Sequence, residues 1–215
     1  MTEWTFAMVD LAGYTALTET HGDEHAAELA TTFTALARDS LGSGDRLIKP
    51  IGDAVLLTAP DPDAGISLVD RLLSASADLE GFPLARAGLH HGPAVERDSD
   101  VFGAAVNLAA RVAGCAAGGQ TLATNQVAEA ARRQGRPVYS IGAVSLRNVP
   151  QPVEVFGITL GPTRTAGDVD PVCRMWVDHD HAAGRLRHGS RDYWFCSLDC
   201  VASFASAPEQ FATLG

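Results

Sequence analysis

The chain has 215 residues, of which 46% are hydrophobic, so it is long enough to bury more than one core. Its formal net charge of -10 argues against an extended polyanionic partner, either nucleic acid or an acidic membrane surface. No apolar stretch approaches the roughly 20 residues of a membrane-spanning helix, and residues 1–4 lack the features of a signal peptide, so we expect a soluble, cytoplasmic protein.

The first third of the chain alternates between apolar runs and amphipathic segments. Residues 4–10 predict a strand, residues 13–21 a turn that enters a short helix, and residues 23–40 a longer amphipathic helix. Residues 47–59 predict two strands joined at Gly52-Asp53, a dipeptide typical of a tight hairpin.

The middle of the chain completes a recognisable order of elements. A helix is predicted over residues 61–79, strands over 85–90 and near Val95, and a further helix from Gly103. The order β, α, β, β, α, β indicates an α+β fold, a ferredoxin-like sandwich with its helices on one face of an antiparallel sheet. A strand, a helix and two strands follow, the last over residues 153–159.

A change of composition divides the chain near residue 161. Residues 161–168, GPTRTAGD, are polar and rich in Gly and Pro, which is typical of a linker. We therefore predict a first domain over residues 1–160 and a small C-terminal α+β module over residues 169–215. A module of this size is near the lower limit for independent folding, so we expect a metal or a partner to stabilise it.

Two aspartates are candidate metal ligands in the first domain. Asp10 ends the first predicted strand, and Asp53 lies in the hairpin turn that should neighbour it. Either residue alone would ordinarily be a solvated turn residue. Together they can hold two divalent cations, and Gly13 opens a helix N-terminus suited to phosphates.

A second polar pair lies on the helix that follows Gly103. Asn107 and Arg111 are four residues apart and share one face, while Ala105, Leu108 and Val112 form the buried face. The polar pair therefore points away from the core. The simpler alternative is an exposed arginine and a tolerated asparagine, although asparagine is unfavourable inside a helix.

These motifs together resemble the catalytic domain of class III adenylate/guanylate cyclases over residues 3–160. The motifs are MVDLAGYT with Asp10, IKPIGDAVLL with Lys49 and Asp53, and DVFGAAVNLAAR with Asp100, Asn107 and Arg111. The resemblance implies that the two aspartates bind Mg²⁺ or Mn²⁺, two ions per site. It also implies the roles of the remaining four residues, base recognition by Lys49 and Asp100 and catalysis by Asn107 and Arg111.

The residue types at these positions favour ATP as the substrate and cyclic AMP as the product. Lys49 can donate to an adenine ring nitrogen and Asp100 can accept from the exocyclic amine, whereas guanine presents the reverse pattern. Guanylate-specific relatives typically carry Glu and Cys at these positions. Arg111 can stabilise charge on the α-phosphoryl group. Arg147 matches a family lysine that contacts the triphosphate.

The resemblance also implies a homodimer, because in this family the metal-binding aspartates of one chain meet the other four residues of a second chain. One chain carries all six residues, so a twofold dimer would contain two equivalent sites. The competing hypothesis is a nucleotide-binding dimerisation scaffold whose C-terminal module carries a metal- or redox-sensing function.

The C-terminal module contains three of the four cysteines of the chain. Its motifs DPVCRMWVD and YWFCSLDCVASF resemble a YHS domain, a small metal-associated module. Cys196 and Cys200 can approach one thiophilic metal such as Zn²⁺ if Ser197 caps a helix, and Cys173 can complete the thiolate set. The fourth ligand stays open between a water and three histidines, His179, His181 and His188.

Two further predictions concern the cysteines. The alternative to metal binding in the module is a core of reduced cysteines with histidines on the surface. Cys115 lies alone in an Ala- and Gly-rich stretch, which predicts a buried small hydrophobic residue. If the module binds metal, we expect its occupancy to change the activity of the first domain.

Overall fold

The strand β1 (Thr2–Leu11) is an interior strand of an eight-stranded sheet in the computed structural model, which describes residues 2–162, 164 and 166–212. The strand order is β2-β3-β1-β4-β6-β8-β7, and the short strand β5 pairs with β4. The bounds are β2 (Arg46–Ile51), β3 (Ala54–Ala59), β4 (Ala85–Arg97), β5 (Asp100–Phe102), β6 (Thr121–Thr124), β7 (Val138–Val144) and β8 (Val153–Ile158).

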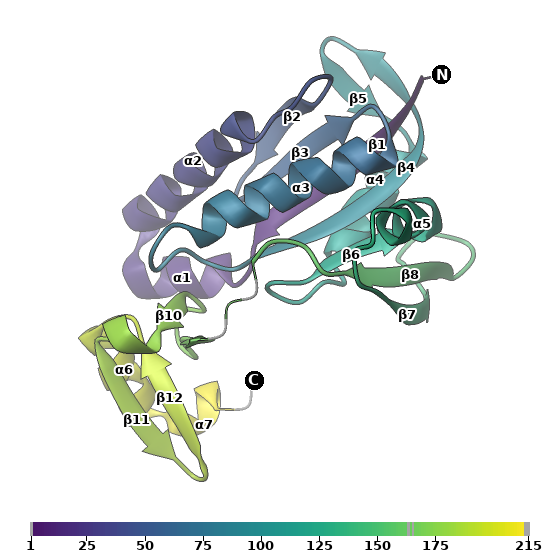
Figure 1. Cartoon of the computed structure of the whole chain (residues 1–215). Helices are drawn as coiled ribbons and strands as arrows, with labels where there is room; N and C mark the ends of the chain where they lie inside the picture. Colours follow the sequence, from purple (N-terminus) through teal and green to yellow (C-terminus); the bar gives the residue numbers. More distant parts are fainter. Residues whose placement is uncertain (1, 163, 165, 213–215) are drawn as a thin grey trace.

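Helices cover both faces of this sheet. The helices are α1 (Tyr14–His21), α2 (Asp23–Asp39), α3 (Pro62–Ala77), α4 (Ala104–Ala113) and α5 (Asn125–Arg133). Helices α2 and α3 lie in front of the sheet in Figure 1, and α4 lies behind it. We call the side that carries α4 the α4 face.

The alternation of side chains along β1 explains the two layers. Ala7, Val9 and Leu11 belong to the main core, which also contains apolar residues of α2, α3 and α5. Phe6 points to the opposite side, where it packs in a second core with Ala105 and other residues of α4. Each strand residue faces the side opposite to its neighbour, so β1 supports both cores.

The α+β fold and the order of elements are confirmed, and two details of the prediction are wrong. The helices do not all lie on one face, because α4 packs on the side opposite to α2 and α3. The sheet is not purely antiparallel, because β4 pairs with β6 in parallel. The strands predicted separately near residues 85–90 and 95 are one strand, β4, which pairs with β5 through a two-residue turn at Asp98 and Ser99.

The C-terminal module has its own small core, below the large sheet in Figure 1. It contains two two-stranded sheets, β10-β9 and β11-β12, followed by two helices. The bounds are β9 (Gly167–Val169), β10 (Trp176–Asp178), β11 (Gly184–His188), β12 (Arg191–Phe195), α6 (Leu198–Ser206) and α7 (Pro208–Phe211), with a 3-10 helix over His179–His181. Strand β9 begins inside the predicted linker 161–168, and residues 163, 165 and 213–215 lie outside the described residues.

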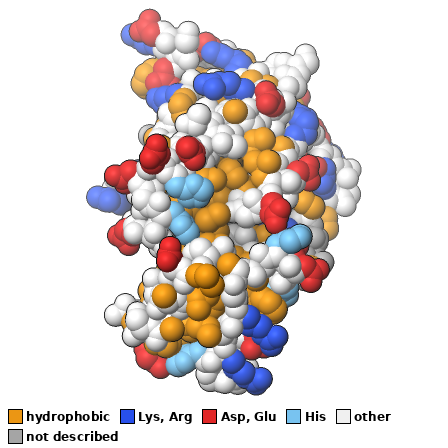
Figure 2. Space-filling model, turned by 90° about the vertical axis from the view of Figure 1, so that its left-hand side faces the viewer, with side chains coloured by type: hydrophobic (Ala, Val, Ile, Leu, Met, Phe, Trp, Pro, Cys, Tyr) orange, Lys and Arg blue, Asp and Glu red, His pale blue; other side chains and the backbone are white. Residues whose placement is uncertain are grey.

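The space-filling view shows the larger domain and the module as two bodies in contact (Figure 2). An isolated strand bridge joins Pro83 to Met175 across this contact, and His181 lies 3.4 Å from the carboxylate of Glu80. Among the helices of the described residues, none is both long enough and apolar enough to cross a membrane.

Gly88 in β4 allows α4 to approach the sheet closely. A Cβ atom at this position would lie 2.1 Å from the backbone nitrogen of Ala113 and 2.5 Å from the carbonyl oxygen of Ala109. Both neighbours are backbone atoms of α4, so a side chain at residue 88 can be accommodated only if the helix moves.

We therefore expect Gly88→Ala to lower the free energy of unfolding by about 1–3 kcal/mol, the usual cost of overpacking. Gly114→Ala is the matched control, because a Cβ atom there meets its nearest neighbour at 3.5 Å and the residue has right-handed helical angles. Chemical denaturation of the two variants measures the difference. Equal stability of the two variants would contradict the close packing of α4 on β4.

Candidate active site

Asp10 and Asp53 lie beside one another at the end of β1. Asp10 is paired in register with Ala54 of β3 and with Arg86 of β4. Asp53, the residue before Ala54, therefore lies next to Asp10. The backbone nitrogen of Leu11 donates to the carbonyl oxygen of Asp53 at 3.4 Å, which ties the β2–β3 turn to the end of β1. The backbone of Asp53 therefore adjoins the end of β1 that carries Asp10.

Arg86 adds a cation to this pair. Its Nε donates to one carboxylate oxygen of Asp10 at 2.6 Å, and its Nη2 donates to the other at 2.9 Å. This is a bidentate, half-buried ion pair, the geometry in which a guanidinium holds a carboxylate most firmly. The ion pair fixes Asp10 in a single orientation at the end of the strand.

The charges of this cluster are not balanced within the chain. Burial raises the pKa of the Asp53 carboxyl, and the negative charge of Asp10 raises it further, while Arg86 lowers it. The hydrogen bond to Asp10 raises the pKa of Arg86, so the guanidinium stays charged. Within the described part of the chain Asp53 has no ion pair, and one arginine therefore faces two carboxylates.

Lys49 and Asp100 are also brought together, although 51 residues separate them. Lys49 lies in β2 and Asp100 opens β5, and the Lys49 Nζ donates to the Asp100 carboxylate at 2.5 Å. The other carboxylate oxygen of Asp100 accepts from the backbone N–H of Val101 at 2.8 Å. The hydrogen bond to Lys49 lowers the pKa of Asp100, which keeps the carboxyl ionised as an acceptor.

Asn107 and Arg111 lie on α4, as predicted, and point away from its buried face. Asn107 is exposed and Arg111 is half-buried. Ala105 and Val112 are buried as predicted, together with Ala109, whereas Leu108 is only half-buried. Among the described residues, no hydrogen bond or ion pair joins either side chain to Asp10 or Asp53. Arg147 is exposed in the loop between β7 and β8.

Three large hydrophobic side chains near the Lys49–Asp100 pair are exposed to solvent. Ile51 is 46% exposed, Val95 is 42% exposed and Phe102 is 53% exposed. The Lys49 ammonium lies 6.0 Å from the centroid of the Phe102 ring. These side chains leave an apolar rim open beside a charged pair.

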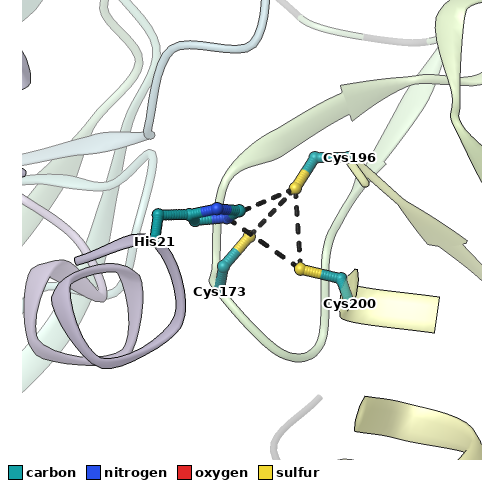
Figure 3. Close-up of side chains that lie close together, drawn as sticks. All are labelled: His21, Cys173, Cys196 and Cys200. Atoms are coloured by element: carbon teal, nitrogen blue, oxygen red, sulfur yellow. Dashed lines mark hydrogen bonds between the residues drawn. The ribbon is translucent and has the colours of Figure 1, made fainter. Parts of the chain in front are cut away.

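A second cluster lies where the module meets α1. The sulfur of Cys196 lies 3.3 Å from that of Cys173 and 3.7 Å from that of Cys200. The fourth member is His21, the last residue of α1, whose Nε2 lies 3.6 Å from the Cys196 sulfur and 3.9 Å from the Cys200 sulfur. Figure 3 shows the His21 ring pointing from α1 toward the three sulfur atoms.

The three histidines considered from the sequence are placed elsewhere. His179 pairs with Asp168 at 2.9 Å and stacks on Trp194, and His188 lies 3.2 Å from a carboxylate oxygen of Glu209. His181 faces Glu80 of the larger domain. None of these three histidines, which the sequence left open as the fourth ligand together with a water, lies at the thiols, and each has an acidic neighbour away from the sulfur atoms.

The thiols are organised by Asp170, a buried carboxylate at the centre of the module. One of its oxygens accepts from the backbone N–H groups of Val172 at 2.8 Å and Cys173 at 3.4 Å, and the other accepts from Cys196 at 2.8 Å. Ser197 caps α6 as predicted, and its hydroxyl accepts from the N–H of Cys200 at 3.2 Å. Arg174 adopts φ 67°, so the tight turn beside Cys173 forms without glycine.

The three thiols do not titrate alike. Hydrogen bonds from the thiols of Cys173 and Cys196 lower the pKa of Cys200. Hydrogen bonding with Cys196 raises the pKa of Cys173, and burial raises it further. The cluster therefore favours a thiolate at Cys200, the sulfur at the start of α6.

Two residues of these sites were missed by the sequence analysis, and one assignment was wrong. Arg86 had a signal, since it is a charged residue between two buried alanines of a predicted strand. His21 had none, because it lies 175 residues before Cys196 and belongs to another part of the fold. Cys115 is exposed rather than buried, because it follows the end of α4 on the surface.

No family model matches the chain, and its similarity to known proteins comes from individual sequences. A pH-sensitive adenylate cyclase of Mycobacterium tuberculosis is 38% identical over 165 residues, which are 75% of this chain and 42% of that protein. An adenylate cyclase of Streptomyces griseus is 36% identical over 104 residues, 48% of this chain and 26% of that protein. The chain thus spans less than half the length of these curated relatives.

A shorter similarity concerns another class of protein. A copper-transporting P-type ATPase of Rhizobium leguminosarum is 48% identical over 44 residues, 20% of this chain and 5% of that protein.

The solved structures are similar over the larger part of the chain. An adenylate cyclase of Trypanosoma brucei, solved in its monomeric state, superposes with a TM-score of 0.68 at 21% identity, and the match covers 77% of this chain and 93% of that one. The adenylyl cyclase CyaB of P. aeruginosa superposes with a TM-score of 0.60 at 17% identity, over 75% of this chain and 95% of that one. The eight-stranded sheet and its helices therefore have the fold of adenylate cyclase catalytic domains.

Proposed function

We propose that the protein is an adenylate cyclase that converts ATP to 3′,5′-cyclic AMP and pyrophosphate. The observation that carries this proposal is the arrangement on the α4 face, with Asp10 and Asp53 at the end of β1 and the Lys49–Asp100 pair between β2 and β5. The curated adenylate cyclases of similar sequence support the same activity. In this proposal, the carboxylate pair would hold the metal ions and the Lys49–Asp100 pair would recognise the base.

The residues at the end of β1 fit a divalent cation. Two carboxylates share one arginine, so the cluster has an excess of negative charge. Burial raises the pKa of Asp53, because its carboxylate charge is only partly compensated. Carboxylate oxygens are ligands that Mg²⁺ and Mn²⁺ prefer. When bound, two such ions would activate the 3′-hydroxyl of ATP and neutralise the leaving pyrophosphate.

The side chains around the carboxylates have separate tasks in this proposal. Asp10 and Asp53 would hold the ions, and Arg86, which pairs with Asp10 here, would be free to donate to an oxygen of the triphosphate. Asn107 orients the ribose. Arg111 donates to the α-phosphoryl oxygens, where negative charge develops during the in-line attack, and Arg147 contacts the triphosphate.

Lys49 and Asp100 read the base. The ammonium donates to a ring nitrogen of adenine, and the carboxylate accepts from its exocyclic amine. The existing ion pair between them holds both side chains at one place in the nucleotide-free protein, which reduces the entropy lost when the base binds. Guanine would present a donor to Lys49 and an acceptor to Asp100, leaving both groups mismatched.

The complete site requires two copies of the chain. Asn107 is exposed on α4, and the large hydrophobic side chains of Ile51, Val95 and Phe102 are exposed near the Lys49–Asp100 pair. A twofold dimer would bury these hydrophobic side chains and bring the α4 residues of each copy to the carboxylates of the other. The C-terminal module, which we infer to be YHS-like and metal-associated, is the regulatory part of the protein.

The first prediction tests the shared site. Asp10→Ala, Asp53→Ala and Arg111→Ala should each reduce cyclic AMP formation to background. A mixture of Asp53→Ala with Arg111→Ala should recover up to about a quarter of wild-type turnover, because half of the dimers would be mixed and each would contain one intact site.

The matched control for this test is a mixture of Asp10→Ala with Asp53→Ala, which removes ligands from the same half of the site and should stay inactive. Exchange into mixed dimers is followed with two differently tagged chains. A mixture of Asp53→Ala with Arg111→Ala that exchanges fully and remains at background would disprove the shared site.

The second prediction concerns the base. Lys49→Glu combined with Asp100→Cys should reduce kcat/KM for ATP by about 10- to 100-fold per mismatched contact, since each leaves a polar group unpaired at about 1–3 kcal/mol. The ratio of kcat/KM for ATP to that for GTP is the measurement. Arg46→Ala with Glu96→Ala removes a neighbouring bidentate pair and should leave the ratio unchanged. An unaltered ratio in the first variant would remove Lys49 and Asp100 from base recognition.

The third prediction concerns Arg86. Arg86→Ala should tighten Mn²⁺ binding to the nucleotide-free protein by about tenfold, because the competing cation is gone, and should raise KM for ATP by a similar factor. Mn²⁺ affinity is measured by titration and KM by initial rates. Arg136→Ala, which removes the ion pair with Asp70 elsewhere, is the control. Weaker Mn²⁺ binding in Arg86→Ala would contradict the competition.

A further inference from the structure

We propose that His21, Cys173, Cys196 and Cys200 form one site for a thiophilic divalent cation such as Zn²⁺, and that this ion fastens the C-terminal module to α1. One ligand comes from the larger domain and three come from the module (Figure 3). The four ligand atoms all lie within 4.8 Å of one another. The site therefore joins two parts of the fold that are far apart in the sequence.

The distances match the edges of a tetrahedron around one ion. With Zn–S near 2.3 Å and Zn–N near 2.0–2.1 Å, a regular tetrahedron has S···S edges of about 3.8 Å and S···N edges of about 3.6 Å. Four of the six edges are 3.3 and 3.7 Å between sulfur atoms and 3.6 and 3.9 Å from sulfur to the His21 Nε2. The other two, from the Cys173 sulfur to the Cys200 sulfur and to the His21 ring, are within 4.8 Å. Three cysteines and one histidine form a closed set of four ligands, which is typical of a structural zinc site.

The surroundings hold the sulfur ligands in place from two directions. Asp170 accepts from the backbone of Cys173 and of Cys196, and thus fixes the loop and the strand end that carry them. Ser197 caps α6 and positions Cys200 in its first turn. Such outer contacts are what orient the ligands in known metal sites.

The module contacts both ends of α1, which gives the ion a consequence for the nucleotide site. At the first end, a Cβ atom on Gly13 would lie 2.3 Å from the Cβ of Arg174, so the module packs directly on the turn that begins α1. At the second end lies His21, about 12 Å further along the eight-residue helix. Gly13 follows Asp10 by three residues, so an ion at His21 would restrain the helix next to the carboxylate pair.

Metal binding to the full-length protein tests the site without reference to activity. The reduced protein should bind one Zn²⁺, or one Co²⁺ as a spectroscopic probe with the absorption of a tetrahedral thiolate site. His21→Ala should weaken Zn²⁺ binding by about 100-fold or more. Removing a residue that only hydrogen-bonds a metal ligand already costs about 10- to 100-fold in affinity, and His21 would be a ligand itself. His188→Ala is the matched control, because His188 lies in the module but faces Glu209.

A conservative variant separates ligand loss from misfolding. His21→Cys should restore Co²⁺ binding with the stronger sulfur-to-metal absorption of a four-thiolate site, and circular dichroism checks that each variant is folded. An unchanged affinity and spectrum in His21→Ala would overturn the role of His21. A reduced, folded wild-type protein that binds neither ion, and whose cysteines form a disulfide on mild oxidation, would overturn the metal site.

Hydrogen exchange tests the fastening of the module. Zn²⁺ should slow amide exchange in residues 14–21 of the wild-type protein by at least tenfold, and it should leave these amides unchanged in His21→Ala. An effect confined to the module would show that the ion does not reach α1 and would overturn this part of the proposal. The effect of Zn²⁺ on cyclic AMP formation rests on the proposed function, and the binding and exchange measurements are independent of it.

Discussion

The register of β1 against β3 and β4 is the constraint on which the candidate active site depends. It places Asp10 opposite Ala54 and Arg86, and so next to the turn that carries Asp53. A slip of one residue would turn Asp10 into the main core on the side of α2 and α3 and would turn Val9 and Leu11 to the side of α4. The two faces of β1 are not interchangeable, because Val9 and Leu11 pack in the main core on one side, whereas Phe6 packs in the second core on the side that carries Asp10.

Electrostatics then determines how this end of β1 behaves. Arg86 neutralises Asp10, while burial and the charge of Asp10 raise the pKa of Asp53. The cluster thus holds two carboxylates and one guanidinium. Divalent cations would supply the positive charge that it lacks. In the proposed function, Arg86 pairs with the Asp10 carboxylate until a cation binds there, and it then becomes available to the phosphates.

Much of this arrangement could be predicted from the sequence. Hydrophobic periodicity predicted the helices that the structure contains over Asp23–Asp39 and Pro62–Ala77, and the Gly52-Asp53 dipeptide predicted the β2–β3 hairpin. The pairing of Lys49 with Asp100 followed from a family resemblance, since no local pattern links residues 51 positions apart. The sequence did not predict the contacts that depend on how whole helices and strands pack together. Periodicity does not state which face of a sheet a helix covers, and nothing local to the module indicates that its thiols meet His21 of α1.

The most direct test of the proposed activity is the stoichiometry of the reaction that the purified full-length protein carries out with ATP and Mn²⁺. Cyclic AMP and pyrophosphate are quantified together by mass spectrometry and a coupled enzymatic assay. The account predicts equal amounts of the two products, strict dependence on the divalent ion, and loss of both products in Asp53→Ala. Release of ADP and phosphate, or nucleotide binding with no turnover, would contradict it and would favour a nucleotide-binding scaffold.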